Sequence, residues 1–162
     1  MAETKTITLS VNGRDRNLDV PANATLLETL REHGYFEVKS CCEKGDCGTC
    51  AVLVDGAALD SCLTLTWTVA GRAITTVAGL STGDSKHPLI ESFETAGAVQ
   101  CGYCTPGLIL AAQSMLAVTP DPSDDEIREG LSGNLCRCTG YTKVFDAVRE
   151  AAQTLRDQGG QT

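Results

Sequence analysis

The sequence predicts an α+β fold in two parts, a mixed unit of strands and one helix followed by a small all-helical unit. Apolar residues alternate as in strands in the first half of the chain and follow helical spacing in the second. A segment rich in Gly, Ser and Pro separates the halves. The predicted boundaries are residues 1–78 for the mixed unit, 79–88 for the linker, 89–157 for the helical unit and 158–162 for a flexible tail.

The chain is expected to begin with a β-hairpin. Residues 4–11 alternate between apolar and polar side chains, which predicts a half-buried strand. The dipeptide Asn12-Gly13 follows, and this pair is a strong signal for a tight hairpin turn. The return strand should end at Pro21, which cannot donate a backbone hydrogen bond.

A short helix and further strands are expected next. Thr25 and Glu28 have the spacing of a capping box, so a helix should start near Thr25 and stop by Gly34. The cysteine-rich loop that follows is too rich in glycine for regular structure. Strands are predicted at residues 51–54 and 73–77, each bounded by a glycine turn.

The second half predicts about four helices. A short helix is expected at residues 89–93 and a longer one at 106–118, with proline in its first turn. Ser123 and Glu126 form a second capping box. A last helix is predicted over residues 144–155, because its apolar residues recur at helical spacing.

Composition excludes several classes of function. The formal net charge is −8 and there is no basic stripe, which argues against a nucleic-acid partner. The first residues contain no apolar segment typical of a secretory signal, and no run approaches the roughly 20 apolar residues of a membrane span. We therefore expect a cytoplasmic, reducing setting, where clustered cysteines bind metal more often than they form disulfides.

Four cysteines in the first half have the spacing of plant-type [2Fe–2S] ligands, C-x4-C-x2-C with a distant fourth. This set is Cys42, Cys47, Cys50 and Cys62. Each iron of such a cluster needs two thiolates, and a short loop can wrap one side. Gly45 and Gly48 allow close approach of the backbone and its N–H groups. A zinc site and disulfides are the alternatives, and the isolated fourth cysteine counts against zinc.

Four cysteines in the second half form C-x2-C followed about thirty residues later by C-x-C. This set is Cys101, Cys104, Cys136 and Cys138. In a helical unit these would be two interhelix loops that face each other. Because C-x-C is uncommon in zinc knuckles, a second cluster is favoured over zinc.

Other reactive side chains receive no metal-ligand role. The x4 spacing selects Cys42 as ligand, so Cys41 is interpreted as a spare cysteine, or as an alternative ligand if Cys42 is lost. His33, near a helix C-terminus, should make a capping or dipole contact. His87 lies in the predicted linker. No nucleotide-binding motif and no nucleophile–base pairing stands out, so no catalytic residue is assigned.

The chain resembles the small, iron–sulfur subunit of the xanthine oxidase family of molybdenum hydroxylases. The motifs are CEKGDCGTC with a later SC (residues 42–62), VQCGYCTPG (99–107) and GNLCRCTGY (133–141). The resemblance covers nearly the whole chain. It implies an N-terminal β-grasp domain of the plant-ferredoxin type and a C-terminal four-helix bundle, each with one [2Fe–2S] cluster. One departure is Cys41, where the family usually has glycine.

The same resemblance implies partners and an electron route. A large subunit would hold a molybdenum–pterin cofactor and a medium subunit would hold FAD, in a heterotrimer or a dimer of heterotrimers. Electrons would pass from molybdenum to the C-terminal cluster, then to the N-terminal cluster, then to FAD or another acceptor. In such proteins the residues equivalent to Gln100 and Cys138 approach the pterin. A helix-capping amide is the alternative role for Gln100.

The function expected from this resemblance is electron transfer within a multi-subunit hydroxylase. Its substrate is expected to be an N-heterocycle or an aldehyde. A carbon monoxide dehydrogenase or an acyl-thioester reductase small subunit is an alternative. A free-standing two-cluster ferredoxin and a structural zinc module are alternatives from other classes.

Overall fold

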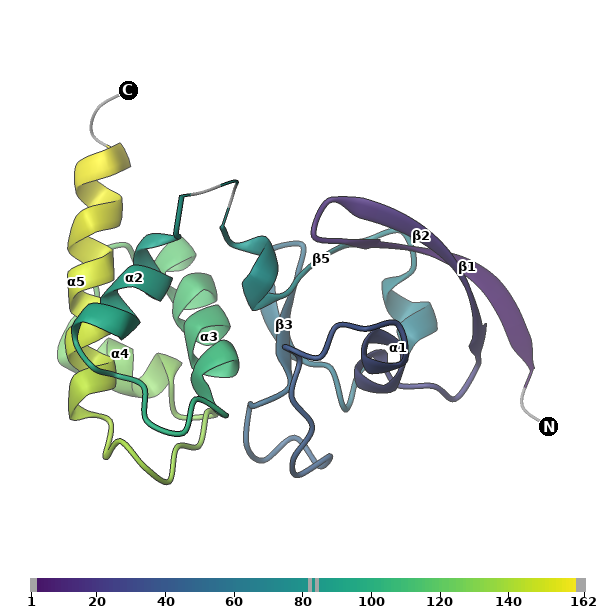
Figure 1. Ribbon diagram of the computed structural model, residues 1–162, viewed down its shortest axis with the longest axis horizontal. Coiled ribbons are helices and arrows are strands. Elements are labelled where there is room, and N and C mark those ends of the chain that lie inside the picture. Colours follow the sequence, from purple (N-terminus) through teal and green to yellow (C-terminus); the bar gives the residue numbers. More distant parts are fainter. Residues whose placement is uncertain (1–2, 82, 84, 160–162) are drawn as a thin grey trace.

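The computed structural model describes residues 3–81, 83 and 85–159, with strands gathered at one end and most helices at the other (Figure 1). Thr82 and Asp84 of the predicted linker, and residues 160–162 of the predicted tail, lie outside the described residues. Among the described residues no helix is long and apolar enough to cross a membrane. The elements are β1 Thr4–Val11, β2 Arg14–Pro21, α1 Leu26–Glu32, β3 Ala51–Val54, β4 Ala57–Asp60, η1 Thr66–Val69, β5 Ala73–Thr75, η2 Val77–Gly79, α2 Pro88–Thr95, α3 Thr105–Val118, α4 Asp124–Gly130 and α5 Thr142–Gly159.

The N-terminal half is built on a mixed five-stranded sheet in the order β2-β1-β5-β3-β4. Strand β1 pairs antiparallel with β2 and parallel with β5, and β3 is antiparallel to both β5 and β4. Asn12 and Gly13 have φ values of 52° and 73°, so the predicted hairpin turn is confirmed. The alternation predicted for β1 is also confirmed, because Ile7, Leu9 and Val11 are buried.

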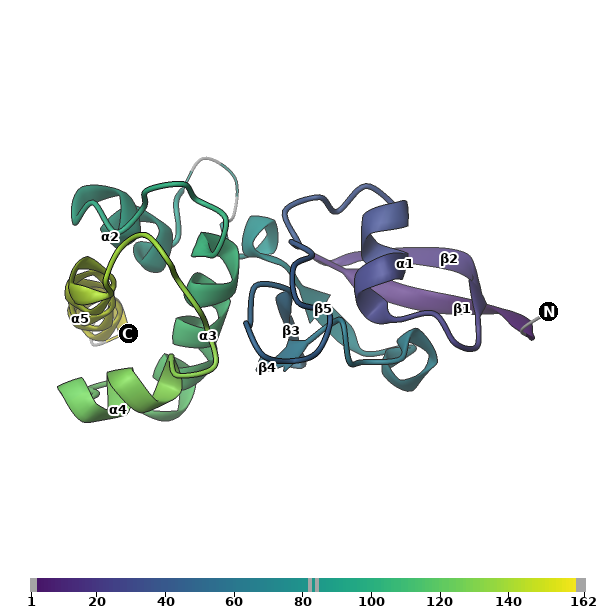
Figure 2. The same cartoon turned by 90° about the horizontal axis from the view of Figure 1, so that it is seen from below.

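Helix α1 covers one face of this sheet (Figure 2). The predicted capping box is confirmed, since the Thr25 side chain accepts from Glu28 N–H and the Glu28 carboxylate accepts from Thr25 N–H. The helix ends before Gly34, whose φ of 90° suits glycine. Leu26 and Leu30 are almost fully buried in the core under the sheet.

In the described part of the second half, α2 to α5 form the four helices predicted, and they enclose a separate apolar core. Phe93 of α2, Leu108 of α3, Ile127 of α4 and Val148 of α5 are each at most 1% exposed. The second capping box is confirmed at Ser123. The α+β class is therefore confirmed. Helix α3 joins this helical core to the sheet by packing against β3 and β4.

One strand prediction was wrong at its end, and one strand was missed. The strand expected at residues 73–77 ends at Thr75, because the backbone N–H of Thr76 donates to the side-chain oxygen of Asn12 rather than to a strand. Val77–Gly79 forms a 3-10 helix instead. Strand β4 was not predicted, and it exists because the turn at Asp55 folds it back onto β3.

The helices also extend past the predicted limits. Helix α2 begins at Pro88, within the expected linker, because the ring of His87 accepts a hydrogen bond from Leu89 N–H. Helix α5 continues to Gly159, two residues beyond the expected end of the helical unit. The domain boundaries themselves stay a prediction.

Candidate metal centres

The N-terminal cysteine loop is shaped by residues in the left-handed region. Glu43, Gly45 and Gly48 have φ values of 53°, 78° and 64°. Alternation of this conformation with ordinary turns points successive N–H groups toward one side of the loop, which suits an anionic group. The N–H of Lys44 already donates to the sulfur of Cys42 at 3.5 Å.

Cys42 and Cys47 form the first pair of thiols. The backbone N–H of Lys44, followed by the Cys47 side chain, lowers the pKa of Cys42 to about 7. Burial raises the pKa of Cys47. The loop therefore holds one thiol that loses its proton more readily than an ordinary cysteine beside a second thiol that loses it less readily.

Cys50 and Cys62 form the second pair. They flank the β3–β4 hairpin, in which Ala51 lies opposite Asp60, and this pairing brings the distant Cys62 back to the loop. Burial raises the pKa of Cys50 to about 12, and contact with the Cys62 thiol adds to the rise. The carboxylate of Asp60 lies 3.6 Å from the Cys50 sulfur.

The C-terminal set also divides into two pairs. Cys104, at the N-terminus of α3, contacts Cys136, and burial raises the pKa of Cys104 to about 12. The Cys138 and Cys101 sulfurs lie 3.7 Å apart and both residues are exposed. Burial alone would raise the pKa of Cys136, but the hydroxyl of Thr139, which donates to its sulfur at 3.1 Å, helps to lower it to about 7.

Tyr141 fastens the loop that carries Cys136 and Cys138. Its hydroxyl accepts from the Cys136 N–H at 2.7 Å and donates to the Asn134 carbonyl at 3.0 Å. The Tyr141 N–H donates to Thr139 Oγ1 at 3.3 Å. Tyr141 has a φ of 68°, a conformation that bulky residues rarely adopt, so these bonds hold a strained turn next to the predicted ligands.

The two cysteine loops contact each other directly. The N–H of Leu135 donates to the Cys47 carbonyl at 3.0 Å. The hydroxyl of Tyr103, which lies between Cys101 and Cys104, donates to the Ser40 carbonyl at 2.5 Å. The loops that carry the two sets of thiols therefore touch each other where the halves meet.

The donor set fits [2Fe–2S] clusters. All nine cysteines are free, and the eight predicted ligands come together as four pairs. Two thiolates on each iron is the arrangement that a [2Fe–2S] cluster requires. Within the described residues no three His, Cys, Asp or Glu side chains converge as they would around a single metal ion. The ligand assignment itself stays a prediction.

The remaining candidates lie as follows. Cys41 is exposed, and Cys42 is the member of the doublet that contacts Cys47. Gln100 is exposed and directly precedes the exposed Cys101, and the residue at the N-cap position of α3 is Cys104 rather than Gln100.

The two histidines cap helices. The ring Nδ1 of His33 lies 2.8 Å from the Thr29 carbonyl, which confirms the expected capping contact. His87 caps the start of α2 rather than lying in an open linker, and burial lowers its pKa.

Sequence reasoning gave no role to Thr139, Tyr141, Asn134 or Asp60. The first three lie inside the GNLCRCTGY motif, so their closeness to the cysteines along the chain was the available signal. Asp60 lies two residues before Cys62, but its contact with Cys50 carried no local signal, because it depends on the pairing of β3 with β4.

Comparisons with known proteins agree with the two sets of thiols. A family model described as "2Fe-2S iron-sulfur cluster binding domain" matches residues 9–73, and one described as "[2Fe-2S] binding domain" matches residues 76–149. The nicotine 6-hydroxylase small subunit of Paenarthrobacter nicotinovorans is 44% identical over 95% of this chain and 93% of its own length. The xanthine dehydrogenase iron-sulfur-binding subunit of Escherichia coli O157:H7 is 44% identical over 94% and 98%.

Solved structures show that the similarity also holds for the fold. Quinoline 2-oxidoreductase from Pseudomonas putida 86 matches with a TM-score of 0.91 and 42% identity, over 99% of this chain and 100% of that chain. The aldehyde oxidoreductase from Desulfovibrio desulfuricans matches with a TM-score of 0.90 and 40% identity. There the match covers 95% of this chain but 17% of the other, so the same fold is one segment of a larger polypeptide.

Proposed function

The chain belongs to the iron–sulfur subunits of the xanthine oxidase family of molybdenum hydroxylases, and from this premise we propose how its residues carry electrons through the assembled enzyme. It is the electron-transfer subunit of an oxidoreductase and carries two [2Fe–2S] sites. The clusters, when bound, accept and release single electrons. The protein's task is to hold the two sites close together, stabilise their charge and present them to partners.

The observation that carries this proposal is the arrangement of the eight cysteines as four pairs within two touching loops. Cys42, Cys47, Cys50 and Cys62 would hold the N-terminal cluster, and Cys101, Cys104, Cys136 and Cys138 the C-terminal one. Backbone and hydroxyl donors at two sulfurs support the same assignment, because they would stabilise thiolate and tune the cluster potential.

The exposed pair Cys101 and Cys138 is the proposed entry point for electrons. Gln100 lies beside this pair and is proposed to approach the pterin of a larger molybdenum-binding subunit, together with Cys138. Apolar side chains around the pair, Val99, Tyr103 and Leu135, are 39%, 46% and 56% exposed. A subunit interface would bury such apolar groups.

An apolar cavity next to this pair supports the proposal that this face contacts a partner subunit. It has a volume of about 460 Å³ and lies between α2 and the start of α3, lined among others by Phe93, Val99, Pro106 and Ile109. We assign this face to the molybdenum-binding subunit.

A medium FAD-binding subunit would face the N-terminal loop, and the whole enzyme would be a heterotrimer or a dimer of heterotrimers. In this proposal the N-terminal half is a β-grasp domain and the C-terminal half is a four-helix bundle.

The substrate class proposed for the whole enzyme is an N-heterocycle, with an aldehyde as the second candidate. Relatives named for nicotine and nicotinate are 44% identical to this chain, and one named for aldehyde oxidation is 38% identical. The cytoplasmic setting expected from the sequence belongs to the same proposal.

Purification of the tagged chain from its native host tests the function. We expect a larger chain and molybdenum to co-purify, and reduction by dithionite to give two [2Fe–2S] EPR signals. A chain that purifies alone with both signals would be a mobile ferredoxin. A colourless chain that contains zinc and no iron would be a structural zinc module, and either outcome would contradict the proposal.

A further inference from the structure

Gly48, in the N-terminal cysteine loop, lies at the most crowded contact between the two halves. A Cβ atom added to Gly48 would lie 2.4 Å from the Asn134 side-chain nitrogen and 2.6 Å from the Gly133 carbonyl. A Cβ atom added to Gly107, in the first turn of α3, would lie 2.3 Å from the Gly48 carbonyl oxygen. Backbone therefore packs on backbone here, which only glycine permits.

Hydrogen bonds fix this contact in one register. The Asn134 side chain is 7% exposed, and its Nδ2 donates to the Gly48 carbonyl at 3.0 Å. The next residue, Leu135, donates its N–H to the Cys47 carbonyl, also at 3.0 Å. A buried hydrogen bond from a side-chain amide is costly to break, because the Gly48 carbonyl would lose its partner.

The residues that meet here are close neighbours of predicted ligands of both clusters. Gly48 follows Cys47, Leu135 precedes Cys136, and Gly107 lies three residues after Cys104. One hydrogen-bonded connection between the two sets runs from Cys47 through its carbonyl and the Leu135 N–H to Cys136. Anything that shifts this contact shifts one cluster loop relative to the other.

We infer that Asn134 and Gly107 are positioning residues that set the separation of the two clusters and hence the rate of electron transfer between them. This inference rests on the proposed function. The step is the transfer of one electron, supplied by the molybdenum-binding subunit, in which the C-terminal cluster is oxidised and the N-terminal cluster is reduced with no bond made or broken. Its rate falls steeply as the separation grows, so a small displacement of the loops is enough to slow it.

Two variants test the contact, each changing a different residue that touches the Gly48 carbonyl. Gly107→Ala adds a methyl group against the Gly48 carbonyl, and Asn134→Asp keeps the shape of the side chain but replaces the donor with a carboxylate that faces the same carbonyl. Gly133→Ala is the matched control, because a Cβ atom there would meet nothing within 4 Å.

The measurement uses the assembled enzyme, fully reduced for EPR and initially oxidised for stopped-flow reduction through the molybdenum-binding subunit. Low-temperature EPR reports the magnetic splitting between the two reduced clusters, which depends on their separation, and stopped-flow absorbance reports the transfer between them. We expect both variants to lose part of the splitting and to transfer electrons more slowly, while iron content and the g-values of each cluster stay as in the wild type. Gly133→Ala should match the wild type in every measurement.

An unchanged splitting in both variants, with full iron content, would overturn the inference. An equal change in Gly133→Ala would also overturn it, because the effect would then not depend on the Gly48 contact. If Gly107→Ala fails to assemble, the Asn134→Asp result decides alone. Failure of the proposed function is a separate outcome, recognised by a wild-type protein that shows no pair of [2Fe–2S] signals.

Discussion

At the residue scale, the two sets of thiols receive opposite kinds of polar neighbour. Thr139 donates its hydroxyl to the sulfur of Cys136 at 3.1 Å, which stabilises negative charge. Asp60 places a carboxylate 3.6 Å from the sulfur of Cys50, which opposes negative charge. Hydrogen bonds and charges near cluster sulfurs tune the reduction potential, so these two residues should separate the potentials of the two sites.

Replacing Thr139 should lower the potential of the C-terminal cluster. Thr139→Val keeps the shape of the side chain but removes the donor to Cys136, and with it the acceptor of the longer hydrogen bond from the Tyr141 N–H. The expected decrease is on the order of 50 mV, since about 59 mV corresponds to about 1.4 kcal/mol for one electron and a hydrogen bond to a charged group is of that size. An EPR-monitored redox titration measures it. Thr154→Val, on α5, is the control, and a shift of the N-terminal cluster instead would contradict the assignment.

The cysteine doublet should contain one ligand. Cys41→Gly is expected to leave both EPR signals unchanged, because the contact with Cys47 is made by Cys42. Cys42→Ser should alter the N-terminal signal alone. If the signal of one cluster disappears in Cys41→Gly, the ligand has been assigned to the wrong member of the pair.

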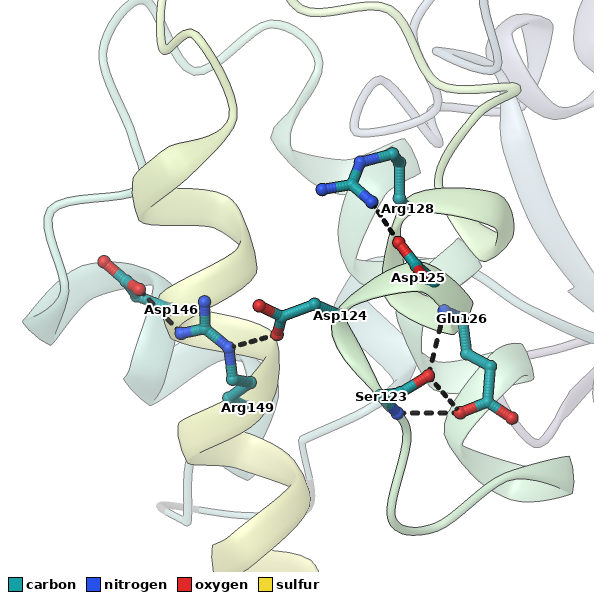
Figure 3. A network of polar contacts seen from close by, with 7 residues as sticks. All are labelled: Ser123, Asp124, Asp125, Glu126, Arg128, Asp146 and Arg149. Carbon is teal, nitrogen blue, oxygen red and sulfur yellow. Dashed lines mark hydrogen bonds and ion pairs between the residues drawn. The ribbon is translucent and has the colours of Figure 1, made fainter.

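At the element scale, the stability of α4 depends more on contacts with neighbouring residues than on the length of the helix. A helix of seven residues is marginal by itself. The capping box of Ser123 and Glu126 holds its start (Figure 3), and Ile127 is buried in the core. Arg149 of α5 joins it, with Nε 2.8 Å from a carboxylate oxygen of Asp124 (Figure 3). Exposed ion pairs contribute little, so the cap should matter more than the pair.

The cap should make stability depend on pH. Hydrogen bonds from the Ser123 side chain and backbone lower the pKa of Glu126 below its usual value. A lowered folded-state pKa gives stability that is present above the unfolded pKa and is lost as pH falls through the folded value. Glu126→Gln should therefore be less stable than the wild type near neutral pH and lose that difference in acid.

Urea unfolding at a series of pH values measures this dependence. Glu129→Gln, on the same helix but outside the cap, is the control. Parallel pH profiles for the wild type and Glu126→Gln would show that the cap carboxylate does not contribute.

At the scale of the whole molecule, the two ends of α3 present different surfaces. The exposed pair Cys101 and Cys138 lies at the start of α3, whereas Val118 ends that helix about 20 Å away. Val99 is 39% exposed beside the pair, and Val118 is 83% exposed at the far end. The exposed fraction of an apolar side chain therefore does not identify the interface by itself. Its position relative to Cys101 and Cys138 does.

A charge placed at the proposed interface should weaken assembly. Val99→Lys is expected to reduce co-purification of the larger molybdenum-binding subunit, because it would bury a charge against an apolar surface. The ratio of the two chains and the molybdenum content measure the effect. Val118→Lys should leave both unchanged. Equal recovery in the two variants would place the interface elsewhere.

The sequence by itself determined the α+β class, the two capping boxes, the first hairpin and the two sets of four cysteines. These features depend on residues that are close together along the chain, such as Thr25 with Glu28 and Asn12 with Gly13, so local spacing was enough to predict them. The family could also be identified this way, because its motifs are continuous stretches.

Only the tertiary structure decided which thiols form pairs and how the two loops meet. Cys62 reaches Cys50 through the β3–β4 hairpin, whose second strand was not predicted, and Asp60 arrives with it. Gly48 meets Gly107 and Asn134 across the two halves. Such contacts join residues far apart in sequence, and they are selected by the packing of a sheet against a helix, which leaves no periodic signal in the chain.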